Sequence, residues 1–350
     1  MRIIFDIVHP ADVLFFKRPV EIFRARGDEV LLVSREKDVA ISLIEEFGFP
    51  HECASRQNSG LLGLGLEMLR RDITLLRIAR RFRPDVMIGF GGVAIAHVGR
   101  LLSIPSVSFY DSENATLQTR VTWPFIGHLY VPRSYDGPVP EGRTTRVPGT
   151  KELSYLHPAG FTPDREVAAR HGLDPGQENF LVRVVAWRAN HDVGKAGWSP
   201  DLLRKVVGHL AAQGKVHLSS ELPLPDELDR LRYKGPARDI HHLVGCCRLL
   251  VGESATMASE AAVMGVPGIY AGRDFPGYVR ELEAAGLLTN VEEVTEARVL
   301  GAIENALATP LGEIAARRDA HVASCPDWAH VVVDALDAAA RLPGQVGDKG

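Results

Sequence analysis

The sequence predicts an α/β protein made of two parallel-sheet domains in tandem. Short apolar runs alternate with longer amphipathic runs, which is the pattern of strand–helix–strand units. The alternation begins again near residue 180, after a stretch rich in proline and glycine. The chain has 350 residues, more than the roughly 250–300 at which a single hydrophobic core usually stops growing.

The first half contains one set of expected strands and helices. The expected strands cover residues 2–8, 29–34, 85–90, 106–110 and 127–131. Helix-like stretches lie around residues 13–26, 36–47, 66–82 and 93–103. Because strands alternate with helices, we expect a parallel sheet whose carboxyl strand ends share one edge.

The second half repeats this scheme. Its expected strands cover residues 180–187, 215–220, 248–252 and 266–270. Its helices are expected near residues 200–213, 226–233, 239–246 and 256–264. Two such sheets facing each other would enclose a cleft, so residues that follow the strands are the first candidates for a site.

The boundary between the domains is predicted from composition. Residues 132–163 are rich in proline and glycine and are expected to be an interdomain crossing. The predicted domains are 1–155 and 156–325. A final helix over 326–342 is expected to pack back towards the first domain, and 343–350 are expected to be a disordered tail.

Composition excludes several classes of function. The net charge of −4 argues against a general nucleic-acid-binding protein. No apolar run approaches the length of a membrane span, and the first eight residues read as a strand rather than a signal peptide. The four cysteines lack metal-ligand spacing, which favours a reduced, cytoplasmic location and no metal site.

Candidate catalytic residues follow the strands of the first half. His9 comes directly after the first strand, where an imidazole could act as a general base; the alternative is a polar residue in a turn. Asp111 and Glu113 follow another strand in the segment YDSEN. They could be catalytic carboxylates or part of an ordinary helix cap.

Candidate anion-binding residues occur in the second half. Arg188, His191 and Lys195 crowd a glycine-containing loop after its first strand, where cations could hold a diphosphate. The chain contains no Asp-x-Asp, the usual carboxylate arrangement for a metal-bound nucleotide diphosphate.

The segment 251–270, VGESATMASEAAVMGVPGIY, joins a strand to a helix rich in small residues. The helix start at Ser254, Ala255 and Thr256 offers backbone amides to an anion. Glu260 lies one turn further on the same face as Thr256, where a carboxylate could accept hydrogen bonds from a ribose diol. The alternative is an alanine-rich helix that merely packs on a sheet.

Several of these segments resemble a known family. SEAAVMGVP is similar to the ribose-binding helix of the peptidoglycan N-acetylglucosamine transferase, a GT-B glycosyltransferase. More specifically, the chain resembles a family of archaeal and bacterial proteins catalogued as a domain of unknown function and considered GT-B-like. The matching segments are FDIVHPADVLFFK, YDSENA, GTKELSYLHP, RVVAWRANHD, SSELPLP and GESATMASEAAVMGVP.

The resemblance implies a GT-B fold, with two Rossmann-like domains facing a cleft and the nucleotide sugar bound by the second. It implies that Glu260 binds the ribose and that residues 254–256 surround the diphosphate. It places His9 where related transferases have a histidine, although VHPAD replaces their glycine-rich loop. Asp111 and Glu113 fall near the relative's acidic loop, displaced by one position.

The predicted function is a metal-independent glycosyltransferase that uses a nucleotide-diphosphate sugar, UDP-linked by expectation, and no cofactor. The acceptor would be a glycan or a polyprenyl-linked molecule in cell-surface polysaccharide or glycolipid synthesis. Two alternatives stay open: an isomerase resembling UDP-N-acetylglucosamine 2-epimerase, and a non-catalytic nucleotide-sugar-binding protein. The basic, leucine-rich stretch 61–83 could make peripheral contact with the inner face of a membrane, or could be a core helix with a solvated side.

Overall fold

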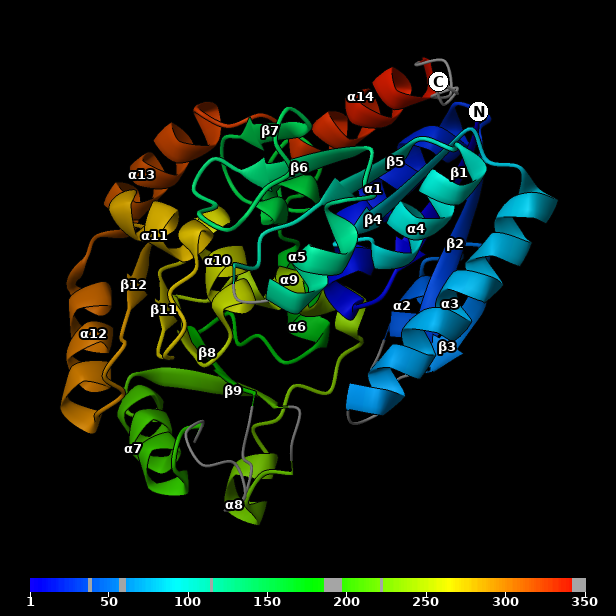
Figure 1. Cartoon of the computed structure of the whole chain (residues 1–350). Coiled ribbons are helices and arrows are strands. Elements are labelled where there is room, and N and C mark those ends of the chain that lie inside the picture. Colours follow the sequence, from blue (N-terminus) through cyan, green and yellow to red (C-terminus); the bar gives the residue numbers. More distant parts are fainter. Residues whose placement is uncertain (37–39, 57–60, 114–115, 186–196, 221–222, 342–350) are drawn as a thin grey trace. The chain divides into compact units, whose positions relative to one another are not determined.

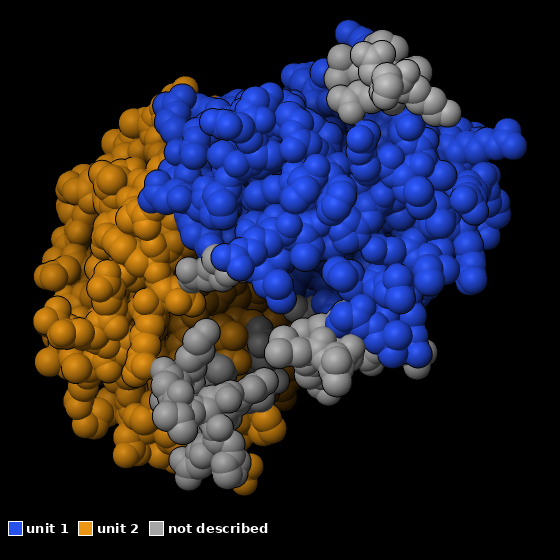
Figure 2. All heavy atoms as spheres, in the orientation of Figure 1, with its two compact units in different colours: residues 1–155, 326–350 blue, residues 156–325 orange. Residues whose placement is uncertain are grey.

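The computed structural model contains two compact units, each built around its own parallel sheet (Figure 1). The structure describes residues 1–350 except 37–39, 57–60, 114–115, 186–196, 221–222 and 342–350. Unit 1 comprises residues 1–155 and 326–350, and unit 2 comprises residues 156–325 (Figure 2). The predicted tail at 343–350 lies outside the described residues, and the predicted cleft stays a prediction.

Unit 1 contains a seven-stranded sheet in the order β3-β2-β1-β4-β5-β6-β7. Every neighbouring pair of strands is parallel. The strands are β1 (Arg2–Ile7), β2 (Glu29–Glu36), β3 (His51–Arg56), β4 (Val86–Phe90), β5 (Ser106–Phe109), β6 (His128–Pro132) and β7 (Thr144–Val147). The helices are α1 (Pro10–Ala25), α2 (Ala40–Glu46), α3 (Leu61–Phe82), α4 (Val93–Leu102), α5 (Thr116–Thr122), the 3₁₀ helix η1 (Lys151–Ser154) and α14 (Trp328–Arg341).

Helices cover both faces of this sheet, which explains why its central strands read as continuous apolar runs. On one face, Phe5 of β1 packs edge-on against Phe16 of α1, with ring centroids 5.3 Å apart. On the other face, the preceding residue of β1, Ile4, belongs to a buried cluster with Leu75 of α3 and Ile95 of α4. Successive strand residues point to opposite faces, so a two-sided core needs apolar side chains at every position.

Unit 2 contains a five-stranded parallel sheet in the order β12-β11-β10-β8-β9. The strands are β8 (Glu178–Val184), β9 (Gly214–Ser220), β10 (Leu249–Gly252), β11 (Gly268–Tyr270) and β12 (Leu288–Asn290). The helices are α6 (Arg165–Arg170), α7 (Pro200–Ala211), α8 (Asp226–Asp229), η2 (Ala237–Asp239), α9 (Ile240–Val244), α10 (Ala255–Val263), α11 (Gly277–Ala284), α12 (Glu296–Ala308) and α13 (Leu311–Ala323).

The stretch 132–163 is more than an interdomain crossing, which corrects the expectation from composition. It contains β7, the edge strand of the first sheet, and η1, which packs on α1 and α14. Strand β7 has four residues, of which only Val147 is buried, so it lacks the apolar run that marks a strand in a sequence. In the described part of the chain, no helix is both long and apolar enough to cross a membrane.

Candidate functional site

Each sheet contains one point at which strands that follow one another in the chain switch from one side of the sheet to the other. In unit 1, β1 lies between β2 and β4; in unit 2, β8 lies between β9 and β10. The connections that leave two such neighbouring strands depart on opposite sides, and this opens a crevice at the carboxyl ends of the strands. The residues after β1 and β4, and those after β8 and β10, are therefore the ones that the fold presents to ligands.

In unit 2, the turn after β10 leads directly into α10. Gly252 ends the strand, and a Cβ atom there would lie 2.0 Å from the carbonyl oxygen of Arg183 in β8, so only glycine fits. Ser254 caps the helix by accepting a hydrogen bond from the amide of Met257 at 3.2 Å. The first amides of any helix have no acceptor within it, so the start of α10 can bind an anion.

Ala255 and Thr256, two of the predicted diphosphate-binding residues, form the first turn of α10. Both are partly exposed, unlike the rest of the helix from residue 258 to residue 263, which is buried. The exposed end of α10 is thus the end that carries the positive pole of the helix dipole.

Glu253 has a role that the sequence did not indicate. Its carboxylate accepts hydrogen bonds from the amide of Val185 at 3.1 Å and from the amide of Trp198 at 2.6 Å. These two amides lie on either side of residues 186–196. Glu253 therefore holds together the residues on either side of 186–196, the segment that contains the predicted cationic residues. Those residues, Arg188, His191 and Lys195, lie outside the described residues.

Glu260 lies on the buried face of α10 and is 3% exposed. One oxygen of its carboxylate, Oε1, is 3.1 Å from Nε2 of His241 in α9. This contact fixes the orientation of the carboxylate, one turn beyond the partly exposed Thr256. The ribose-binding role of Glu260 stays a prediction.

In unit 1, His9 is the N-cap of α1. The side chain is exposed, and its Nδ1 accepts a hydrogen bond from the amide of Ala11 at 3.2 Å. The Asp12 carboxylate completes the cap by accepting the amides of Val8 and His9, each at 2.9 Å. With Nδ1 as the acceptor, a neutral imidazole carries its proton on Nε2. The capped ring can therefore donate a hydrogen bond, and to act as a base it would have to release Ala11.

Asp111 is buried after β5 and forms an ion pair with Lys151 of η1, with 2.5 Å between Oδ2 and Nζ. Its other oxygen accepts a hydrogen bond from the hydroxyl of Ser112 at 3.0 Å. Lys151 Nζ also lies 3.5 Å from Oε1 of Glu152, a fully buried carboxyl group whose pKa is raised by burial. Both oxygens of Asp111 are engaged, and its catalytic role stays a prediction.

The Lys151 ammonium connects this cluster to the cap of α1. Burial raises the pKa of Asp12 to about 7, and the charge of Lys151 opposes that rise. The structure thus brings together, at one edge of the sheet, the helix start that carries His9 and the strand end that carries Asp111. Glu113 is partly exposed, two residues after Asp111. It is the predicted carboxylate of this loop that solvent can reach.

Lys151 and Glu152 were missed as site residues. They belong to the segment GTKEL, which matched the family pattern but lies in the stretch expected to cross between domains. Nothing in a lysine–glutamate pair distinguishes a buried position from a solvated one, because both residue types are nearly always exposed. Agreement with the family pattern was the signal that could have drawn attention to them.

Comparisons with known proteins agree with this architecture. Residues 1–158 match the model of a family described as a protein of unknown function, DUF354. This match confirms the predicted resemblance. A UDP-N-acetylglucosamine–N-acetylmuramyl-(pentapeptide) pyrophosphoryl-undecaprenol N-acetylglucosamine transferase from Anaeromyxobacter sp. (strain Fw109-5) is 32% identical over 112 residues, 29% of each chain. The matched part spans about a third of the length of such curated relatives.

Two solved structures cover nearly all of the chain. The spinosyn rhamnosyltransferase SpnG, complexed with thymidine diphosphate, has a TM-score of 0.65 at 14% identity and covers 96% of this chain, with 100% of its own length matched. UDP-GlcNAc 2-epimerase from Neisseria meningitidis, bound to UDP-GlcNAc, has a TM-score of 0.66 at 10% identity; the match covers 97% of this chain and 100% of the epimerase. The chain therefore has the two-domain GT-B fold, as predicted.

Proposed function

We propose that this chain is a glycosyltransferase that transfers a sugar from a nucleotide-diphosphate sugar, with UDP as the expected nucleotide, and needs no metal ion for the transfer. The observation that carries the proposal is the start of α10. A capped helix begins there beside the reversal point of the unit 2 sheet, directly after a glycine that admits no side chain. This is a suitable place for a diphosphate.

The remaining donor contacts follow from the direction of α10. With the diphosphate at residues 254–256, a ribose one turn further along would approach Glu260 from the side of Thr256. Arg188 or Lys195, in the segment whose flanking residues bond to Glu253, would stabilise the developing charge of the departing diphosphate. The lack of an Asp-x-Asp segment is consistent with these cations taking the place of a metal.

During transfer, the bond between the anomeric carbon and the diphosphate oxygen breaks, and the acceptor oxygen forms a new bond to that carbon. The proton of the acceptor hydroxyl passes to a base, for which unit 1 offers His9, Asp111 or Glu113. Glu113 is partly exposed, whereas Asp111 is buried, and the Nδ1 atom of His9 accepts the amide of Ala11 in its cap. His9 would then donate a hydrogen bond through Nε2.

A lipid-linked acceptor fits the exposed side of α3. Leu66, Leu69 and Ile73 are 47%, 55% and 40% exposed, and Arg70 and Arg77 lie exposed on the same stripe of the helix. Apolar side chains next to cations suit an anionic membrane surface. The relative from Anaeromyxobacter carries a pyrophosphoryl-undecaprenol acceptor in its name.

The donor assignment is tested by measuring two ligands, UDP and 2′-deoxy-UDP, against two proteins, the unaltered chain and a variant at Glu260. Glu260→Gln should weaken UDP binding by about 1–3 kcal/mol, roughly 5- to 150-fold, because a ribose hydroxyl loses its carboxylate acceptor. In the unaltered protein, 2′-deoxy-UDP should bind more weakly than UDP. In the variant, the two ligands should bind nearly equally. Titration calorimetry measures all four affinities.

Glu292→Gln, a change of an exposed glutamate in the same unit, serves as the control and should leave all affinities unchanged. If the variant at position 260 still distinguished UDP from 2′-deoxy-UDP as the unaltered protein does, Glu260 would not bind the ribose 2′-hydroxyl. If neither UDP nor any UDP-sugar bound the unaltered protein, the proposed donor would be wrong.

An epimerase is the second candidate, because the Neisseria epimerase is as similar in fold as the rhamnosyltransferase. Such an enzyme would eliminate and re-add the nucleotide without a separate acceptor. Incubation with UDP-GlcNAc alone separates the two proposals. A new epimer in the absence of any acceptor would favour the isomerase, whereas transfer that depends on an added acceptor would favour the transferase.

A further inference from the structure

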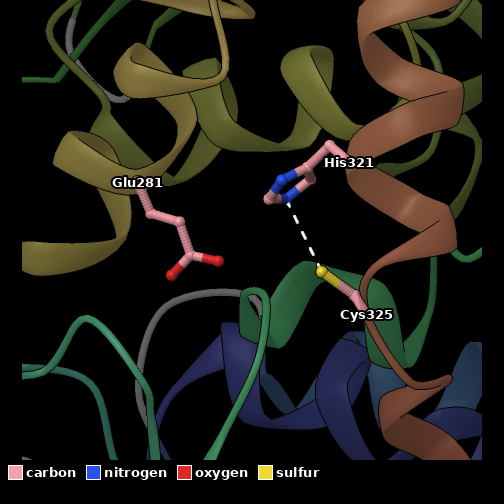
Figure 3. A group of neighbouring side chains, drawn as sticks. All are labelled: Glu281, His321 and Cys325. Carbon is pink, nitrogen blue, oxygen red and sulfur yellow. Dashed lines mark hydrogen bonds between the residues drawn. The ribbon is translucent and has the colours of Figure 1, made fainter.

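Three metal-ligating side chains converge in unit 2 on elements that contribute none of the predicted donor-site residues. Glu281 lies on α11, His321 lies in the last turn of α13, and Cys325 follows that helix. One ligand atom from each, an oxygen, a nitrogen and a sulfur, lie within 4.8 Å of one another, and all three residues are partly buried. Figure 3 shows the carboxylate, the imidazole and the thiol directed towards a common space.

The end of α13 holds two of these ligands in place. His321 Nε2 lies 3.9 Å from the Sγ of Cys325, four residues on. A tight turn follows the helix, in which the amide of Cys325 donates a hydrogen bond to the carbonyl of Val322 at 3.0 Å. Ser324 donates its hydroxyl to the His321 carbonyl at 2.7 Å. The thiol is thereby kept beside the imidazole by local backbone geometry.

A separate contact brings the third ligand to the other two. Arg317 of α13 donates to the carbonyl of Gly286, just beyond the end of α11, at 3.0 Å. His321 is one turn further along α13 than Arg317, and Glu281 lies more than one turn before Gly286. The two helices are thus joined beside the cluster, so the carboxylate reaches the imidazole without help from a ligand.

The chemistry of the three groups suits zinc. Zinc binds cysteine sulfur, histidine nitrogen and carboxylate oxygen at about 2.0–2.3 Å, and a fourth position can be taken by water. A carboxylate and a thiolate together balance a divalent charge, which matters in a partly buried place. Magnesium and calcium bind mainly oxygen ligands, so a site with a thiol and an imidazole suits them less well than zinc.

We propose that Glu281, His321 and Cys325 form a binding site for a zinc ion, with water as the fourth ligand. When the zinc–sulfur bond forms, the thiol gives up its proton to solvent. The ion would fix the end of α13 against α11, at the point where the chain leaves unit 2. This role is structural and independent of the proposed sugar transfer.

Cobalt reports the site directly. The full-length protein, stripped with a chelator, should develop the visible bands of tetrahedral cobalt and a near-ultraviolet thiolate-to-cobalt charge-transfer band as Co²⁺ is added. Zn²⁺ should abolish both. Added zinc should also raise the melting temperature, because an ion that binds only the folded protein stabilises it.

Variants separate this site from other thiols and imidazoles. Cys325→Ser should remove the charge-transfer band, and His321→Gln and Glu281→Gln should each weaken zinc binding at least tenfold. Cys53→Ser and Cys246→Ser should change neither the charge-transfer band nor the affinity for zinc. In the presence of chelator, every variant should melt at the temperature of the unaltered protein, which shows that the fold is intact.

Two results would overturn the site. The first is a charge-transfer band that persists in Cys325→Ser or disappears in Cys246→Ser, because the ion would then be bound elsewhere. The second is unchanged zinc affinity in Glu281→Gln or His321→Gln, because the three groups would then not act together. Either outcome leaves the proposed glycosyl transfer untouched, since that is tested by UDP binding.

Discussion

At the scale of single residues, one cluster in unit 1 contains more buried carboxyl groups than neighbouring cations. Asp12, Asp111 and Glu152 surround one lysine, Lys151. Removing a carboxylate from water is costly, and this cost favours the protonated form of a buried carboxyl group. The pKa of Glu152 is raised by burial, and that of Asp12 is raised by burial to about 7.

The raised pKa of Asp12 leads to a prediction of how the free energy of unfolding depends on pH. Its pKa is about 7 in the folded chain, against an ordinary value of 3.8. Below pH 4 both states are protonated; between pH 4 and 7 the unfolded chain ionises first, so the free energy of unfolding falls as pH rises. The loss is at most on the order of 4 kcal/mol. Asp12→Asn keeps an oxygen for the amides of Val8 and His9, and should reduce this loss.

Urea unfolding at several pH values between about 4 and 8 measures the effect, because a buried aspartate titrates across that window. The variant should match the unaltered protein at the acid end and exceed it in stability at the neutral end. Asp226→Asn, at an exposed position on α8, is the control and should follow the unaltered protein throughout. A variant curve parallel to the unaltered one would show that Asp12 does not titrate in this window.

At the scale of helices and strands, the sequence predicted the elements whose pattern is set by burial. The central strands β1, β4 and β10 were found because both of their faces are covered and most of their positions are apolar, with the buried Asp6 of β1 as an exception. Strands β3 and β7 were missed because they lie at the sheet edges and keep exposed or polar positions. The sequence of an edge strand shows little apolar patterning. Its assignment depends on pairing with a neighbouring strand, which the sequence of a single segment does not reveal.

The site shows the same limit. The N-terminus of α10 could be predicted, because a strand, a capping serine and a helix follow one another in the sequence. The pairing of Glu260 with His241 and that of Asp111 with Lys151 could not, since each joins elements far apart in the chain. For the same reason, the spacing of the cysteines did not reveal the group formed by Glu281, His321 and Cys325.

Helix α3 carries a prediction of its own. Arg71 is buried and bonded to Asp6, so it belongs to the core, whereas Arg70 and Arg77 are exposed beside Leu69 and Ile73. If this stripe meets an anionic bilayer, the protein should sediment with vesicles that contain phosphatidylglycerol and not with phosphatidylcholine alone. The double change Arg70→Gln and Arg77→Gln should weaken binding by about 2 kcal/mol, roughly 30-fold, at about 1 kcal/mol per basic residue.

The matched control is Arg298→Gln, which removes an exposed arginine from α12 in unit 2. It should sediment like the unaltered protein, and added salt should weaken every anionic-vesicle interaction. Equal loss in the control and the α3 variant would indicate attraction to net positive charge without a defined face. Absence of salt-sensitive binding would remove α3 as a membrane surface.

At the scale of the whole molecule, unit 1 is assembled from both ends of the chain. Helix α14 returns to it after the whole of unit 2, and Arg18 of α1 forms a two-pronged ion pair with Asp327, at 2.9 and 2.8 Å. Trp328 is 1% exposed; its indole donates to the carbonyl of Pro148 at 2.9 Å. Its ring packs near those of Phe15 and Phe109, with centroids 6.4 and 6.1 Å away. Unit 1 therefore closes only after unit 2 has been synthesised.

Trp328→Ala tests whether that closure stabilises one unit or the whole chain. Loss of a buried tryptophan costs about 3–5 kcal/mol, and Trp328→Phe should cost less, because a ring remains and only part of the packing and the indole hydrogen bond are lost. Hydrogen exchange followed by peptide should show faster exchange in α1, β1 and β5, with the strands of unit 2 still protected, since the two units have separate buried cores. Equal loss of protection in both units would mean that they unfold as one cooperative body, in which case α14 stabilises the entire chain.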